Sequence, residues 1–120
     1  MAQLEPGAGE LDQRITIRLR EDMPVDEADV ESVFAEPRQR WAKLRAVGTA
    51  AYTDSVQTDD TITHRVWVRR IEGVTTSHEI VSGSMVYRVK RSAPWGAGKR
   101  FTVIEVEELG QQQVGGGIYG

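Results

Sequence analysis

The strongest strand pattern of this sequence is TITHRVWVRRI, residues 61–71. Ile62, Val66 and Val68 alternate there with polar or aromatic residues, and β-branched side chains at a period of two indicate a half-buried strand. Gly73 follows and ends the pattern, because glycine is unfavourable inside a strand. The sequence therefore predicts a strand over Thr61–Ile71 with one face directed into a core.

Five further segments, on both sides of this stretch, show strand patterns. Gly83-Ser84 separates two of them, and glycine accepts the positive φ that the first central position of a type II′ hairpin turn needs. These two segments are therefore expected to pair as a hairpin. The predicted strands are Arg14–Arg20, Gln39–Val47, Thr61–Ile71, Ser77–Ser82, Met85–Arg91 and Arg100–Leu109.

Two segments between the predicted strands lack a strand pattern. Glu21–Pro37 contains two prolines, many acids and only scattered apolar residues, which predicts a long excursion rather than a core element. Gly48–Asp60 is mostly small and polar, which predicts a loop with one or two local helical turns. Six short strands without a long helix indicate an all-β fold, a small antiparallel β-barrel or sandwich with long loops, since these closed forms remove exposed strand edges.

A chain of 120 residues fits a single domain. We expect a flexible N-terminal arm over residues 1–10, a β core over residues 11–109 and a flexible tail over residues 110–120. The tail is rich in glycine and glutamine, and Ile118 and Tyr119 supply too little apolar surface to pack by themselves. Both ends are predicted to become ordered only on neighbouring proteins.

Composition excludes several classes of protein. The sequence has no cysteine, so disulfides, thiolate metal sites and cysteine nucleophiles are excluded, and it has no asparagine to accept an N-linked glycan. Residues Met1–Glu10 lack the basic cluster and the apolar run of a signal peptide. No window approaches the roughly 20 apolar residues of a membrane-spanning helix. The sequence predicts a soluble protein, made in a reducing cytoplasm, that does not contact a membrane.

The net charge of −3 is distributed unevenly along the chain. Residues 21–36 contain seven acids and no base, whereas residues 38–45 contain four bases and no acid. Such segments form either a solvated surface of mixed charge or complementary patches between identical subunits. The candidate contacts to neighbouring subunits or partners are Asp26, Glu27, Asp29, Glu31, Arg38, Arg40, Lys43, Arg45, Ile118 and Tyr119.

The sequence offers little for catalysis. His64 and His78 lie in predicted strands without the spacing of a zinc-binding motif, so structural roles are the ordinary explanation. Residues 95–100 superficially resemble a phosphate-binding loop, but Ala93 stands where its first glycine belongs and Arg100 where a serine or threonine would hold magnesium. We therefore predict no enzyme activity and no catalytic, cofactor or metal site.

Nucleic-acid binding is a competing interpretation. Arg65, Trp67 and Arg69 project from one face of the same predicted strand, and basic and aromatic side chains on a small β-barrel can stack single-stranded bases. The other interpretation is that Trp67 packs under a neighbouring strand while the arginines line its edges. The net acidity also argues against binding that depends on neutralising phosphates.

Four motifs, taken in order, resemble the tailed-phage head-tail joining family, which includes head closure, stopper and neck proteins. They are a glycine-containing leader into an alternating strand, a Trp-Ala pair, a Thr-His-Arg strand and a Tyr-x-hydrophobic element after a glycine hairpin. In this sequence they correspond to Gly9–Ile17, Trp41-Ala42, Thr63–Arg69 and Gly83–Val89. The resemblance covers about residues 9–109. It departs at Gly48–Tyr52, which keeps the family's glycine and aromatic residue but lacks its glutamate.

The resemblance implies a non-enzymatic protein of the virion neck, assembled in the host cytoplasm. As one copy in a homo-oligomeric ring, a dodecamer or hexamer, it would join the portal or adaptor protein to a tail-tube or tail-terminator protein, with packaged double-stranded DNA passing through. Related stoppers project a loop into this channel, which maps to residues 48–60. Its acidic charge suits a surface that must not grip phosphates. The candidate channel residues are Gly48, Tyr52, Asp54, Asp59 and Asp60.

Overall fold

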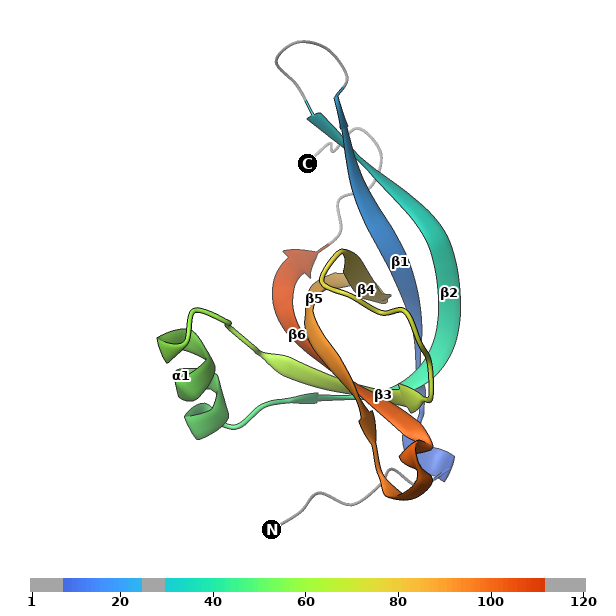
Figure 1. The fold of residues 1–120 in the computed structure, drawn as a ribbon, viewed down its shortest axis with the longest axis vertical. Helices are drawn as coiled ribbons and strands as arrows, with labels where there is room; N and C mark the ends of the chain where they lie inside the picture. Colours follow the sequence, from blue (N-terminus) through green and yellow to red (C-terminus); the bar gives the residue numbers. More distant parts are fainter. Residues whose placement is uncertain (1–7, 25–29, 112–120) are drawn as a thin grey trace.

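The computed structural model describes residues 8–24 and 30–111 of the chain. Within this part, six antiparallel strands form one closed barrel in the order β1-β2-β3-β6-β5-β4 (Figure 1). The predicted all-β fold is therefore confirmed, and of the two forms expected the barrel is the one observed. Residues 1–7 and 112–120, including Ile118 and Tyr119, lie outside the described part, so the predicted flexibility of both ends stays a prediction.

Each predicted strand segment overlaps a strand of the structure, and four of the strands extend beyond the predicted bounds. The strands are β1 (Gln13–Pro24), β2 (Val30–Ala46), β3 (His64–Arg69), β4 (His78–Ser82), β5 (Met85–Trp95) and β6 (Phe101–Gln111). Helix α1 (Thr49–Gln57) connects β2 to β3, and short 3-10 helices occur at Ala8–Glu10 (η1) and Ala97–Lys99 (η2). No helix in the described part of the chain has the length and apolar character that crossing a membrane requires.

Glu21–Pro37 is predicted to be a long excursion without a strand pattern, and the expected lack of strands is wrong. Its described backbone belongs to β1 and β2, which pair from Gln13 with Ala42 to Pro24 with Val30. Both prolines occupy positions that a strand tolerates. Pro24 is the last residue of β1, and Pro37 lies in a bulge where the register shifts between Ile17 and Leu19.

Beyond Leu19, β1 and β2 continue as a two-stranded ribbon of paired residues 20–24 and 30–34. β4 pairs with β1 only as far as Leu19, opposite His78. Figure 1 shows the ribbon extending away from the barrel along the longest axis of the molecule. A ribbon outside the barrel has no core face to bury, so its sequence need not alternate between apolar and polar residues.

The barrel is closed around branched aliphatic side chains. Val66 and Val68, on the face predicted to be buried, have no exposed surface, and β3 pairs with β2 on one side and β6 on the other. Ala42 of β2 is also fully buried, and the largest side chains with less than 2% exposure come from the other five strands: Ile15, Ile17, Val66, Val68, Ile80, Val89, Ile104 and Val106.

The β4-β5 hairpin has the predicted two-residue turn. Ser82 pairs with Met85, so Gly83 and Ser84 alone form the connection. Gly83 has φ +61°, in the left-handed region that favours glycine. The local turn chemistry therefore sets the register of this hairpin, as the sequence predicts.

Candidate functional site

Helix α1 and its flanking residues form an arm beside the barrel, between the ends of β2 and β3 (Figure 1). The helix has nine residues, about two and a half turns, so it is slightly longer than the one or two turns expected. At the base of the arm, Val47 N–H donates to the Thr63 carbonyl at 3.0 Å. The arm, defined as residues 48–60, thus begins where the β2-β3 ladder ends.

Ser55 fastens this arm to the barrel. Its Oγ donates to the Tyr52 carbonyl at 2.7 Å and accepts from Ile62 N–H at 2.9 Å. Asp60 N–H also donates to the Ser55 carbonyl at 2.9 Å. Both Ser55 and Ile62 are buried, so these hydrogen bonds are shielded from water. One small hydroxyl therefore holds the helix against the strand that follows it.

Replacing Ser55 with alanine is expected to destabilise the protein by about 1–3 kcal/mol, because Ile62 N–H becomes a buried donor without an acceptor. Denaturant unfolding measures the loss, and faster amide exchange at Ile62 locates it. Thr53→Ala, at an exposed position of the same helix, is the matched control. Equal losses in the two variants would show that Ser55 has no anchoring role.

The outer side of helix α1 carries two exposed apolar side chains. Tyr52 is 44% exposed and Val56 is 45% exposed. Residues four apart lie on the same face of a helix, so the two form one apolar strip. Of this pair, only Tyr52 was among the predicted channel residues.

The predicted acids of the arm differ in their surroundings. Asp54 and Asp59 are exposed, whereas Asp60 is partly buried and its Oδ1 lies 3.8 Å from Lys90 Nζ. Lys90 Nζ on β5 also lies 3.7 Å from Glu107 Oε1, so the two carboxylates share its positive charge. Gly48, before the first helical residue, has an ordinary extended φ of −71°, so its backbone does not require glycine.

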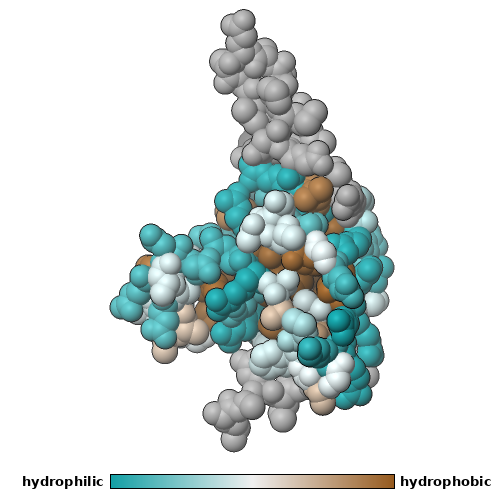
Figure 2. Space-filling model, viewed as in Figure 1, coloured by the Kyte–Doolittle hydropathy of each residue, from teal (hydrophilic) through white to brown (hydrophobic). Residues whose placement is uncertain are grey.

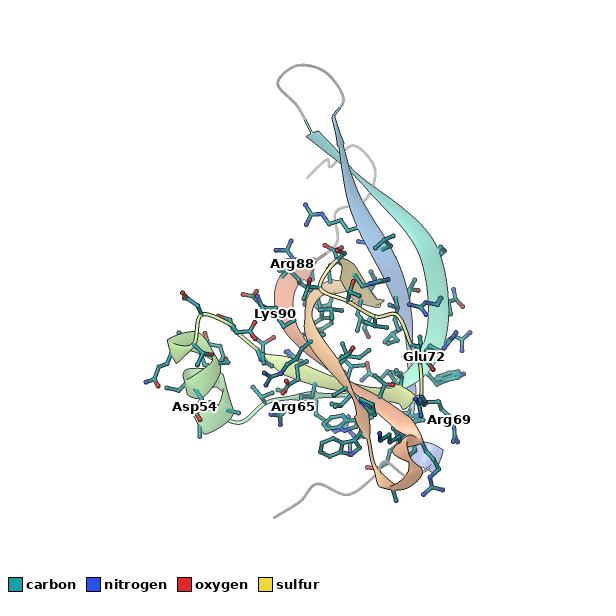
Figure 3. All side chains as sticks on the ribbon, in the orientation of Figure 1. Asp54, Arg65, Arg69, Glu72, Arg88 and Lys90 are labelled. Atoms are coloured by element: carbon teal, nitrogen blue, oxygen red, sulfur yellow. The ribbon has the colours of Figure 1, made fainter. Side chains whose placement is uncertain are left out.

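A groove of about 320 Å³ lies between the arm and the barrel. Figure 3 shows Asp54 on the helix side and Arg65 on the strand side. On the groove floor, Glu105 of β6 accepts from Arg65 Nε at 2.9 Å and from Arg91 Nε. Both arginines therefore form ion pairs with a carboxylate of the same chain, and we assign this groove a structural role.

Burial of Glu105 opposes its ionisation, but the hydrogen bonds from Arg91 and Arg65 outweigh that effect and hold the pKa of its carboxyl below the usual value. The carboxylate is therefore charged throughout the physiological range. Among the side chains that the structure describes, no three or more His, Asp or Glu are grouped so that they could hold a metal ion.

The Trp67 side chain is buried rather than exposed to solvent. It is 5% exposed and meets Trp95 edge-on, with ring centroids 6.5 Å apart. Lys43 Nζ lies 5.3 Å from the Trp67 ring and is paired with Glu10 of η1 at 3.1 Å. The interpretation that Trp67 packs under its neighbours is confirmed, and the ring is not accessible for stacking a base.

The predicted basic cluster over residues 38–45 is not one patch. Residues opposite each other on paired strands share a face, and Arg38 pairs with the core residue Ile17 while Lys43 pairs with the outward Trp67. The guanidinium of Arg38 donates to the Glu72 carbonyl at 3.0 Å, and that of Arg45 donates to the Leu44 carbonyl at 2.8 Å. Strand alternation therefore divides the four bases into two pairs, with Arg38 and Arg40 on one face of β2 and Lys43 and Arg45 on the other.

The predicted acidic contacts cannot be placed. Asp26, Glu27 and Asp29 lie outside the described residues, and for Glu31 the structure describes the β2 backbone but not the side chain. Their role stays a prediction.

A different basic surface surrounds Trp41, which is 53% exposed. We call it the Trp41 patch and define it as Arg14, Arg40, Trp41 and Arg69. The guanidinium of Arg14 lies 5.4 Å from the Trp41 ring centroid. These four residues, with Leu11 and Gln39, line a shallow hollow of about 340 Å³.

Sequence reasoning missed the Trp41 patch, although one signal was available. Trp41 alternates with the buried Ala42, so a strand over this segment places the indole ring on the outer face. The neighbouring arginines come from β1 and β3, and only the pairing register brings them together.

On the face shown in Figure 2 the molecule is mainly hydrophilic, with hydrophobic surface concentrated near the middle of the barrel.

Comparison with known proteins agrees with this architecture. The model of the phage head completion protein family matches residues 7–109. The solution structure of protein SF1141 from Shigella flexneri 2a is similar, with a TM-score of 0.64 at 18% sequence identity; the match covers 86% of this chain and 96% of that chain. At this identity the likeness shows the fold alone. No curated protein matches the chain in sequence.

Proposed function

The chain belongs to the phage head completion protein family, and on this premise we propose that it forms a ring in the neck of a tailed phage. Membership supports a structural role at the junction of head and tail. The proposal goes further, with a dodecameric or hexameric ring between the portal or adaptor protein and a tail-tube or tail-terminator protein. Packaged double-stranded DNA passes through the ring, which assembles in the host cytoplasm.

The family match carries this proposal, because it spans the whole barrel and the arm rather than one motif. The described ion pairs support assembly rather than catalysis. Arg65 and Arg91 bind Glu105, and Arg18 binds the buried Glu79 at 3.2 Å, so these charges stabilise the barrel. A scaffold of this kind presents surfaces to partners.

A phage with the gene deleted tests the role at the junction. We expect DNA-filled heads and separate tails to accumulate, and the wild-type gene supplied in trans to restore tailed particles. Immunogold labelling of those particles should mark the neck. Tailed, infectious particles formed without the protein would overturn the proposal.

Within this ring, we propose that the arm points toward the axis. Its exposed acids, Asp54 and Asp59, repeat around a ring as a negative collar that DNA slides past without adhering. Lys90 lies beside Asp60 and also beside Glu107, so it offsets the charge of Asp60 only in part. Retention of DNA then depends on the bulk of the helix, with Tyr52 and Val56 on its outer side.

Replacing residues 48–60 with a short glycine-serine turn should leave ring assembly intact and let packaged DNA leak from tailless heads. Val47 and Thr63 are already hydrogen-bonded, so the β2-β3 ladder can close without the helix. The companion variant Asp54→Asn with Asp59→Asn keeps the bulk and should retain DNA. Nuclease-sensitive DNA measures the leak. Shortened-arm heads that keep their genome would remove the gating role.

A further inference from the structure

The Trp41 patch is built by three neighbouring strands, with Arg14, Trp41 and Arg69 on the outer face of the barrel. Arg40, which pairs with the core residue Ile15, also lines the hollow. Arg14 on β1 pairs with Trp41 on β2, and Ala42 pairs with Val68, which places Arg69 of β3 beside Trp41. Arg69 in turn lies over Phe101 of β6, 5.8 Å from the ring centroid. Cationic and aromatic side chains therefore alternate across the sheet.

The three arginines of the patch have no carboxylate partner within the described residues. Arg14 donates to the Gln39 side chain at 3.2 Å, and Arg40 donates to the Gln39 carbonyl at 2.8 Å. Arg14 and Arg69 are exposed. Exposed tryptophan and arginine are the residue types that most often supply binding energy at protein interfaces. The patch has the composition of a contact for an acidic protein segment.

The acidic segment of the same chain cannot reach its own patch. Along β1, ten residues separate Arg14, beside Trp41, from Pro24, the last residue of the ribbon paired with Val30. At about 3.3 Å per residue the two ends lie about 33 Å apart. Residues 25–29 join Pro24 to Val30 and are too few to span that distance back.

We infer that the Trp41 patch binds the acidic residues Asp26, Glu27, Asp29 and Glu31 of a second copy of this chain. The three arginines and four acids are complementary in charge, and the exposed indole supplies an apolar centre. The inference rests on the proposed ring and names the contact between its neighbouring subunits.

This contact joins different surfaces of the two copies. Each subunit offers an acidic segment that joins the two strands of its ribbon and a basic patch on its barrel, so every copy binds one neighbour through each. Contacts of this heterologous kind generate rings when the rotation closes.

Two charge-neutralising variants of the full chain test the inference by sedimentation velocity. The patch variant carries Arg14→Gln, Arg40→Gln and Arg69→Gln, and the acid variant carries Asp26→Asn, Glu27→Gln, Asp29→Asn and Glu31→Gln. Each should weaken self-association by about a hundredfold or more at low salt. The control, Arg70→Gln with Lys99→Gln and Arg100→Gln, removes the same charge from exposed positions elsewhere and should behave as wild type.

Mixing the two variants gives a sharper result. The acid variant keeps its basic patch, and the patch variant keeps its acidic residues. Only the contact between these two intact surfaces can form in the mixture. The mixture should therefore form one-to-one dimers and nothing larger. A wild-type chain that stays monomeric, a patch variant that associates normally, or larger species in the mixture would overturn the inference.

A second measurement uses the absence of cysteine from the chain. Asp29→Cys combined with Gln39→Cys should give a ladder of disulfide-linked oligomers, whereas either cysteine alone should give dimers at most. A short DNA duplex bound by wild type and lost in the patch variant would instead assign the patch to nucleic acid. A patch variant that still restores tailed phage would overturn this contact and leave the head-completion role intact.

Discussion

Replacing Ile104 with alanine is expected to lower the free energy of unfolding by about 2–5 kcal/mol, the range for deleting a buried aliphatic side chain. Ile104 has no exposed surface and sits on β6 opposite Val66 of β3 and Ser92 of β5. In a closed barrel the surrounding strands are tied on both sides, so they cannot move in to fill the cavity. Domains of this size have only about 5–15 kcal/mol of stability in total.

Denaturant unfolding of the purified protein measures this loss as a lower midpoint at an unchanged slope. Val56→Ala is the control, because Val56 is 45% exposed and alanine favours the helix. We expect the control to remain within about 0.5 kcal/mol of wild type. Similar losses at Ile104 and Val56 would mean that the barrel interior is not the packed core.

Glu105→Gln is expected to destabilise the protein by about 1–3 kcal/mol at neutral pH, since it removes the charge that accepts from Arg65 and Arg91. We expect a loss in the lower part of this range, because the Arg91 side chain is 64% exposed and solvent screens its pair with Glu105. The glutamine keeps the shape of the side chain, so the loss reports on charge and hydrogen bonding.

The pH dependence of this effect has a definite sign. The pKa of Glu105 is lower in the folded protein than in the unfolded chain, so its contribution is complete above the unfolded pKa. That contribution disappears as the pH falls through the folded pKa. The difference between wild type and Glu105→Gln should therefore be largest at neutral pH and vanish in acid.

Unfolding midpoints across the acidic range test this expectation. Glu72→Gln serves as the control, because Glu72 is highly exposed and lies 4.0 Å from the exposed Arg70. Its stability should follow wild type at every pH. A Glu105→Gln difference that persists undiminished in acid would show that the carboxylate charge is not the stabilising feature.

Local patterns in the sequence predicted most of the barrel. The alternation around Val66 and Val68 identified β3, and Gly83 identified the β4-β5 turn, because both features depend on near neighbours along the chain. The ribbon is not predicted from the sequence, because Pro24 and Pro37 indicate interruptions of a strand. Whether a proline is tolerated depends on the bulge and on the pairing partner, which a single sequence does not display.

The candidate surfaces were less predictable for the same reason. The arm was identified from its position between two strands, but the pairing of Asp60 with Lys90 joins residues 30 positions apart. The bases of residues 38–45 look like a cluster in sequence, yet strand alternation places two of them on each face of β2. The Trp41 patch needs three strands in register before its arginines meet.

Closure of the barrel also has a kinetic consequence. Its joining pairs are distant in sequence, with Ile17 opposite Ile80 and Val66 opposite Ile104. Hairpins such as β4-β5 form in about 1–10 μs, whereas barrels dominated by non-local pairs fold in about milliseconds to seconds. During that interval the nascent chain exposes unpaired strand edges, the state in which chains aggregate. The yield of folded protein therefore depends on how quickly β1 pairs with β4, as well as on the stability of the finished barrel.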